Sequence, residues 1–295
     1  MVMICFEEIE GNPFLRSIKI SKLQGNNHIR SIVNEGDLVT QSDWFIEIWS
    51  WNFVTMAIAP EMREDYSPDT EGCGTLLATD PQALLSFYVE HSRNSLEKLR
   101  AGLSTMLLNP LDHLLSLKRP SDEIAFDLVS LCPGTDHLSN NDLETLFHHC
   151  SFVTLWLNLA FINASNHNIV KLEERNNRED VLIKFLNNSH AAITSELFRL
   201  KLDPVEFAAL KAICIWKMGK LEDTVAAKVL SGEQYLGVAK ALNGYHQTKP
   251  WQDFEKAARL ADITAFMAPI STVFQELMRV YEALDIDDTY KGDLF

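Results

Sequence analysis

Cysteine is scarce in this chain of 295 residues, and the few cysteines are widely scattered. They are Cys5, Cys73, Cys132, Cys150 and Cys214, and none of them forms a CxxC pair. This spacing excludes a zinc finger, which needs paired ligands a few residues apart. We therefore expect buried, reduced thiols in a reducing compartment.

Basic residues are also fewer than acidic residues. The 26 lysines and arginines face 41 aspartates and glutamates, which gives a net charge of −15 and a pI near 5.0. Nucleic-acid binding requires a basic surface, so we expect no direct nucleic-acid contact from this chain. No polybasic block is present that would bind an anionic membrane surface.

Long apolar runs are rare as well. The first residues include Glu7, Glu8 and Glu10 and no apolar signal core, which argues against a secretory leader. The most apolar stretch, residues 44–60, contains Glu47 and is short for a membrane span. We interpret it as a buried segment and expect no membrane partner.

Sequence signs of catalysis are missing. There is no glycine-rich phosphate loop and no GxSxG elbow, so we predict no catalytic residues and no cofactor. Asp285, Asp287 and Asp288 resemble a magnesium-binding motif, but no second acidic cluster of that kind accompanies them. Two adjacent histidines at 148–149 point about 100° apart on a helix and cannot share one metal alone. We predict no metal site.

The chain has enough apolar residues, 46%, to bury a large core. Residues 1–60 are hard to interpret, although the alternation within 16–23 indicates a strand. Residues 61–79 begin with an acidic stretch that contains proline and glycine, which is typical of a linker or loop. We place the domain boundary there, with one helical domain over 80–295.

Two helices carry clear start signals. The first is expected over 80–103, with Asp80 as its N-cap and proline next. The second is expected over 202–219, where Asp203 and a glutamate three residues later form a capping box and Gly219 ends the helix.

The segment 138–164 has a polar start and then becomes apolar nearly all round. A helix of this kind is buried on every side, which predicts the middle layer of a helical domain. No lysine or arginine occurs from Pro120 to Val170. Such a stretch suits the wall of an apolar cavity and equally a plain core.

The last helical pattern has two stripes and a proline. Pro269 predicts a kink near the middle. The main stripe spaces its members by three and four residues and consists of Leu260, Ile263, Met267, Ile270, Phe274, Leu277, Tyr281 and Leu284. The second stripe has small residues that permit close approach of another helix, namely Ala257, Ala261, Ala265 and Ala268.

Read together, these segments resemble the ligand-binding domain of nuclear hormone receptors, most closely the divergent group expanded in nematodes. The likeness covers about 80–295. Its strongest part is 138–161, which is similar to the family signature that joins helices 3, 4 and 5. Within it, the positions that match the signature are Leu138, Asp142, Leu146 and Trp156. Residues 202–216, 233–242 and 259–284 are similar to family helices 8, 9 and 10/11.

The resemblance implies an all-α, three-layer antiparallel helical sandwich that regulates transcription in the nucleus. Its function would be to sense a lipophilic molecule and to bind coregulator proteins. The wall of the ligand site would be formed by Phe126, Val129, Trp156, Leu159, Ile193, Met267, Ile270 and Phe274.

The resemblance also suggests a role for the last ten residues, 286–295. They occupy the place of the family's activation helix, which folds over the pocket and completes a groove for leucine-rich coregulator helices. The groove residues implied are Leu138, Asp142, Leu146, Tyr290, Asp293, Leu294 and Phe295. Residues 255–268 would form a homo- or heterodimer contact. The family's DNA-binding domain, with two four-cysteine zinc sites, has no counterpart in this chain.

Two alternatives remain open on the sequence. One is an all-α scaffold or adaptor whose pocket is filled by side chains and which has no ligand. The other is an all-α lipid-processing enzyme that uses the aspartates at 285–288.

Overall fold

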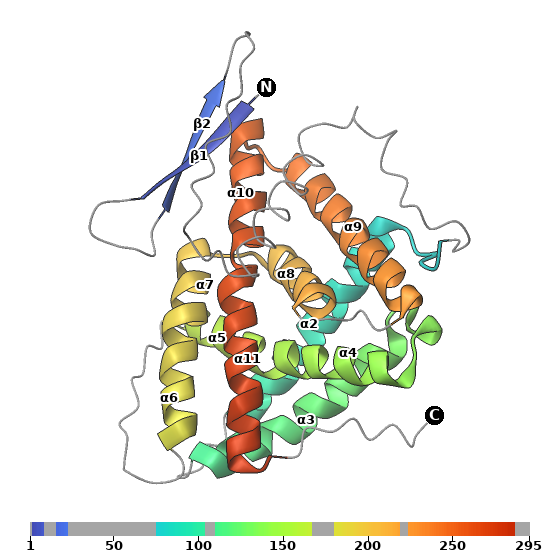
Figure 1. Cartoon of the computed structure of the whole chain (residues 1–295), viewed down its shortest axis with the longest axis vertical. Coiled ribbons are helices and arrows are strands. Elements are labelled where there is room, and N and C mark those ends of the chain that lie inside the picture. The colour runs from blue at the N-terminus through green and yellow to red at the C-terminus, as the bar shows by residue number, and fades with distance from the viewer. Residues whose placement is uncertain are drawn as a thin grey trace, which may run out of the picture. The chain divides into compact units, whose positions relative to one another are not determined.

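A computed structural model describes residues 2–8, 16–22, 75–103, 110–166, 180–218 and 224–286 (Figure 1). The chain divides into two compact units, Met1–Gln41 and Ser42–Phe295. The linker predicted within 61–79 lies mostly outside the described residues and stays a prediction.

The first unit contains a β-hairpin. Strand β1 (Val2–Glu8) pairs antiparallel with β2 (Arg16–Lys22), and Ile4 stands opposite Ile20 in the register. The strand predicted from the alternation in 16–23 is therefore confirmed. The rest of the unit lies outside the described residues.

The second unit is all-α in the ranges that the structure describes, which confirms the all-α part of the predicted fold, while the three-layer sandwich stays a prediction. Its elements, in chain order, are α2 (Pro81–Leu103), α3 (Pro110–Leu131), the 3₁₀ turn η1 (Thr135–His137), α4 (Asn140–Phe152), the π-helical turn η2 (Val153–Leu157), α5 (Asn158–Ser165), α6 (Asp180–Ser189), the π-helical turn η3 (His190–Thr194), α7 (Ser195–Leu200), α8 (Pro204–Lys217), α9 (Val225–Gln247), α10 (Asp253–Ala265) and α11 (Met267–Leu284).

Both predicted N-caps are present. The Asp80 carboxylate accepts a hydrogen bond from the backbone N–H of Gln82 at 2.9 Å, which satisfies a free amide at the start of α2. Asp203 and Glu206 form the expected capping box at the start of α8. Helix α8 ends at Lys217, with Met218 as its C-cap, and Gly219 lies outside the described residues.

The segment α4–η2–α5 lies at the centre of the helical body, as its all-round apolarity predicts. It contacts α2, α3 and α8. By length and composition, Asn140–Ser165 and Asp253–Leu284 could each cross a membrane, but 78% of the first window is buried within the protein. The first stretch is thus a core helix. Its assignment to the middle of three layers stays a prediction.

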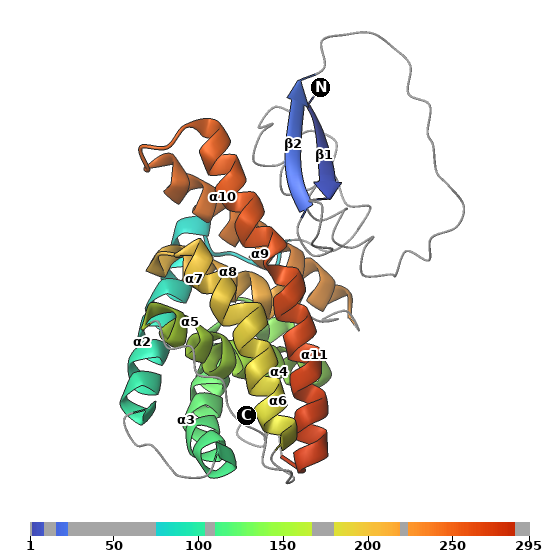
Figure 2. The same cartoon turned by 90° about the vertical axis from the view of Figure 1, so that its left-hand side faces the viewer.

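The final pattern forms α10 and α11, and its main stripe faces the core. All of its members are buried except Met267, which is half-buried. The helix is interrupted at Phe266 rather than at Pro269 itself. The proline ring crowds the carbonyl four residues earlier, at Ala265, so the break comes one turn before the proline. Figures 1 and 2 show α11 running beside α6, and the two helices are in contact.

A polar network joins four parts of the core. The Tyr88 hydroxyl on α2 donates to the Gln234 side chain on α9 at 2.9 Å and accepts from Trp216 Nε1 on α8 at 2.7 Å. Gln234 Nε2 in turn donates to the Pro133 carbonyl at 2.7 Å, in the turn after α3. In that turn Gly134 has a φ of 88°, and a Cβ there would lie 2.5 Å from a Leu230 methyl group. Only glycine fits this turn.

An ion pair between the half-buried Arg259 and the buried Glu206 joins α10 to α8. Arg259 Nη2 and Nε lie 2.6 and 2.7 Å from the two oxygens of Glu206, and His246 Nε2 lies 3.0 Å from one of them. Burial alone would raise the pKa of Glu206, but the hydrogen bonds from Arg259 and His246 lower it to about 2. Arg259 also donates to the Leu200 carbonyl at 2.7 Å, which fixes the end of α7 against α10.

Candidate ligand-binding site

Trp156 lies where helices from distant parts of the chain meet. Its ring is buried and stands edge-on to Phe185 of α6, with 4.8 Å between ring centres. Its Nε1 donates to the Tyr281 hydroxyl of α11 at 2.8 Å. The indole therefore connects η2, α6 and α11 and satisfies its own polar atom within the core.

A second buried group, Lys118 of α3, lies beside Tyr281. Its Nζ is 2.6 Å from Asp122 Oδ2 and 5.3 Å from the centre of the Tyr281 ring. Asp122 also accepts a hydrogen bond from Ser151 of α4 at 2.7 Å. The sequence analysis did not single out this cation. The Lys118–Asp122 spacing of four residues on a helix was the available signal.

Aromatic contacts hold Phe274 in place. Its ring is edge-on to Phe152 and to His149, with ring centres 5.4 and 5.2 Å apart. His149 Nδ1 lies 2.7 Å from the Ile215 carbonyl, and burial lowers the pKa of this histidine to about 4. A neutral, hydrogen-bonded His149 is thus part of the core. Among the described residues no cluster of potential metal ligands occurs.

The predicted wall residues come from α3, η2, α5, η3 and α11. Five of them are buried, namely Val129, Trp156, Ile193, Ile270 and Phe274. Three are half-buried against the same core, namely Phe126, Leu159 and Met267. Their helices meet, since η2 contacts α3 and η3 contacts both α5 and α11. Ligand contact by these residues stays a prediction.

Trp156 and Ile193 occupy π-helical turns, in η2 and η3 respectively. Such wide turns are short insertions in α-helices and are frequent at functional sites. Nothing in the sequence analysis predicted them, because a π turn changes the angular position of later side chains without a residue signature of its own.

The predicted groove residues have internal contacts. The Asp142 carboxylate accepts hydrogen bonds from Ser139 at 2.6 Å and from Thr224, the N-cap of α9, at 2.8 Å. Leu146 is fully buried, and Leu138 is half-buried. Asp142 thus joins α4 to α9. The remaining groove residues, Tyr290, Asp293, Leu294 and Phe295, lie outside the described residues.

A buried amine, Lys211 of α8, was also missed by the sequence analysis. It is 3% exposed, and its Nζ donates to Ser95 Oγ of α2 at 3.1 Å. Asn158 Nδ2 of α5 donates to the same oxygen at 3.0 Å. Burial lowers the pKa of Lys211 to about 7. The amine therefore changes its charge near neutral pH, inside the protein.

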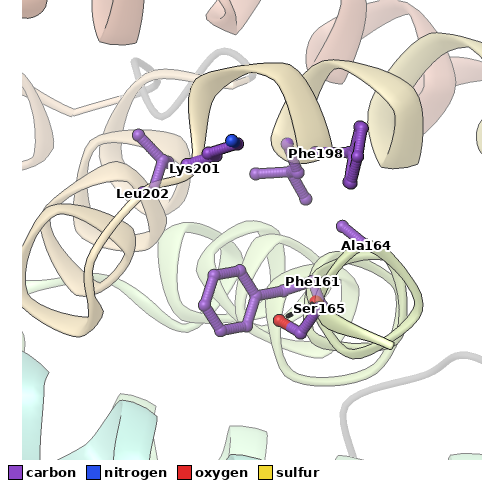
Figure 3. Close-up of a pocket in the computed structure, with 7 residues that line it drawn as sticks. Phe161, Ala164, Ser165, Phe198, Lys201 and Leu202 are labelled. Atoms are coloured by element: carbon purple, nitrogen blue, oxygen red, sulfur yellow. Dashed lines mark hydrogen bonds between the residues drawn. The ribbon is translucent and has the colours of Figure 1, made fainter. Parts of the chain in front are cut away.

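A hollow of about 350 Å³ opens between α5 and α7 (Figure 3). We call it the α5–α7 hollow. It contains none of the predicted wall residues, and its lining consists of Phe161, Ala164, Ser165, Leu197, Phe198, Lys201 and Leu202. The spacing of Phe161, Ala164 and Ser165 on one helical face was the signal available in the sequence.

Comparisons with known proteins find similarity to nuclear hormone receptors. The chain is 26% identical to the nuclear hormone receptor family member nhr-77 of Caenorhabditis elegans, over 76% of this chain and 62% of that protein. It is 27% identical to nhr-89 of the same organism, over 76% of this chain and 71% of the relative. With nhr-174 it shares 32% identity over half of this chain and 46% of the relative.

The chain spans less than two thirds of the length of nhr-77 and of nhr-169, which it matches over 62% and 63%. No family model matches the chain. The relatives agree with the resemblance drawn from the signature segment, and the body that they match is all-α. The chain is thus similar to divergent, nematode-type members of the nuclear hormone receptor family, and this similarity supports a receptor-like ligand-binding domain.

Proposed function

We propose that the helical body over 80–295 senses a lipophilic molecule and passes its bound state to protein partners that regulate transcription. The observation that carries this proposal is the similarity to nuclear hormone receptors over about three quarters of the chain. The ligand would lie among the eight wall residues. Its bound state would be transmitted to the partners through side-chain contacts, without a chemical step.

The contacts around Trp156 support this location. A ligand beside Trp156 would touch η2, α6 and α11 together, because this side chain already bonds to Tyr281 and packs on Phe185. Helix α11 leads directly to residues 286–295, the proposed activation segment. A change in the Trp156–Tyr281 contact would therefore reach the segment that partners would bind.

Native mass spectrometry of the purified protein tests the ligand. We expect a co-purified lipophilic molecule on the wild type and its absence from Met267→Trp, which adds bulk at a half-buried wall position. Leu115→Trp on the exposed side of α3 is the matched control and should retain the molecule. A bare mass for the wild type, with no binding in a lipid screen, would contradict ligand sensing.

A filled core is the second candidate, and one observation favours it. Two wall side chains already pack against other core residues. The Phe274 ring is edge-on to Phe152, and Met267 Sδ lies 3.4 Å from Cys214 Sγ. In that case the protein would act as a ligand-independent receptor or adaptor. Phe274→Ala would then only destabilise the fold, by about 3–5 kcal/mol, without changing ligand recovery.

The partner proposal concerns a leucine-rich coregulator helix and residues 286–295. Burial of Leu294 and Phe295 would contribute roughly 1.5–3 kcal/mol each if complete. Gly292 opposes this by about 1 kcal/mol, so we expect protection only with a partner bound. Hydrogen exchange of 288–295 with and without a leucine-rich helical peptide tests this. Unchanged exchange with every peptide would contradict it.

The dimer proposal concerns residues 255–268. Phe254 is 64% exposed, and Ala261 is only half-buried on the same helix. Sedimentation at micromolar protein should show a mass above 33.5 kDa, and Ala261→Glu should restore the monomer. A strict monomer at high concentration would contradict this contact. We also propose a nuclear location, which a fluorescent fusion in cells would test.

A further inference from the structure

The α5–α7 hollow is apolar on its walls. Figure 3 shows Phe161 and Ser165 on one side and Phe198, Lys201 and Leu202 on the other. Phe198 is 43% exposed, which is unusual for a large aromatic side chain. A volume of about 350 Å³ lies within the range of small-molecule sites in proteins. An apolar group placed here would cover the exposed face of Phe198.

Lys201 is the one cation in the lining of this hollow. The neighbouring basic side chains are occupied, because Arg199 pairs with Glu196 and Arg259 with Glu206. Among the residues that the structure describes, the Lys201 ammonium forms no hydrogen bond and no ion pair. Its charge is therefore available to an anionic group in the hollow.

The backbone at Lys201 gives an independent indication. Its φ is 48°, in the left-handed region at the C-cap of α7, where glycine is the favoured residue. A lysine held in this conformation costs stability, and such positions are concentrated at functional sites. The carbonyls of Leu200 and Lys201 accept hydrogen bonds from Arg259, which offsets the negative end of the α7 dipole. An anion beside Lys201 would thus meet less repulsion from this helix end.

We propose that the α5–α7 hollow binds a lipophilic carboxylate, with its alkyl chain against Phe161 and Phe198 and its carboxylate on the ammonium of Lys201. This is a second site, separate from the core site of the proposed function, since the two share no residue. The hydroxyl of Ser165 already donates to the Phe161 carbonyl at 2.8 Å, so it leaves the carboxylate to Lys201.

Calorimetry with decanoate and with decan-1-ol tests the proposal on the purified full chain. The two probes share an alkyl chain and differ in charge. We expect decanoate to bind about tenfold more tightly, as a charge-assisted hydrogen bond gives. Lys201→Gly should remove that preference, while its thermal unfolding temperature stays equal or rises because glycine suits the left-handed C-cap. Lys201→Arg should retain the preference.

The variant Ser165→Trp tests whether the two probes bind in the α5–α7 hollow. Ser165 is exposed and lines the hollow, so a tryptophan there should block both probes without disturbing the core. Decanoate binding that is unchanged by Lys201→Gly or by Ser165→Trp would overturn the proposal, and so would no decanoate binding by the wild type. Loss of decanoate binding in Met267→Trp, with Ser165→Trp unaffected, would also overturn it and would leave the core site of the proposed function intact.

Discussion

Glu206 and Lys211 are charged residues on the same helix, both are buried, and the protein accommodates them in opposite ways. Glu206 is 1% exposed and receives hydrogen bonds from Arg259, His246 and the Asp203 backbone. Its pKa falls to about 2, so it remains ionised. Every carboxylate oxygen has partners, and the charge is neutralised by a bidentate guanidinium.

Lys211 has no such compensation. Within the described helices its ammonium bonds to Ser95 Oγ, and its Nζ lies 5.9 Å from the Phe207 ring centre. Burial lowers its pKa to about 7. The nearby Ser92 Oγ and Asn158 Oδ1 have no hydrogen-bond partner in the described part of the chain. The buried Glu206 carboxylate is thus stabilised in its charged form by an ion pair, whereas burial favours the neutral form of Lys211.

The largest expected effect comes from breaking the pair. Arg259→Met leaves the Glu206 carboxylate buried without its guanidinium, and we expect a loss of about 3–5 kcal/mol in the free energy of unfolding. Urea denaturation followed by circular dichroism measures it. Adding Glu206→Gln to Arg259→Met should recover part of the loss. A loss below 1 kcal/mol in the single variant would show that the pair is not buried in solution.

The second prediction concerns pH and Lys211. A lysine with a folded pKa of about 7 and an unfolded value of 10.5 binds more protons when unfolded between these values, so it makes stability rise with pH there. From pH 7 to 8.5 its contribution is about 2 kcal/mol. The raised pKa values of the buried Cys150 and Cys214 thiols oppose this rise at higher pH.

The comparison with Lys211→Met isolates that contribution, because both proteins retain the same cysteines. We expect the free energy of unfolding of the wild type, minus that of Lys211→Met, to increase over pH 7–8.5. Parallel profiles for the two proteins would mean that Lys211 is solvated and charged throughout.

The third prediction concerns the Ser95 hydroxyl, which accepts a hydrogen bond from the Lys211 amine. Ser95→Ala removes the acceptor of both Lys211 and Asn158, and each donor is then left buried without that bond. We expect a loss of about 1–3 kcal/mol in the free energy of unfolding. Ser130→Ala on the exposed face of α3 is the matched control and should be nearly neutral. Equal effects of the two serine variants would contradict a special role for Ser95.

The smallest effect is expected for an exposed pair. Arg93 lies 2.6 Å from Glu90, and both side chains are more than half exposed. Arg93→Met should change the free energy of unfolding by less than about 0.5 kcal/mol, since solvent and salt screen such pairs. A loss comparable to that of Arg259→Met would mean that burial does not explain the difference between the two arginines.

The sequence alone determined the helix class, the caps and the central buried segment. Asp80 and the Asp203–Glu206 capping box are local signals that depend only on nearby backbone amides, so they could be read before the structure. The same holds for the α11 stripe and for the signature over 138–161. The stripe and the signature follow from the periodicity of apolar residues, which is a property of the chain itself.

Only the tertiary structure decided what the buried polar residues do. Lys211, Ser95 and Asn158 come from α8, α2 and α5, and no spacing in the sequence indicates that they meet. The hollow beside Lys201 likewise requires α5 and α7 to pack together. Burial, and with it a shifted pKa or an available cation, depends on which helices cover a side chain, and that is set by packing between distant segments.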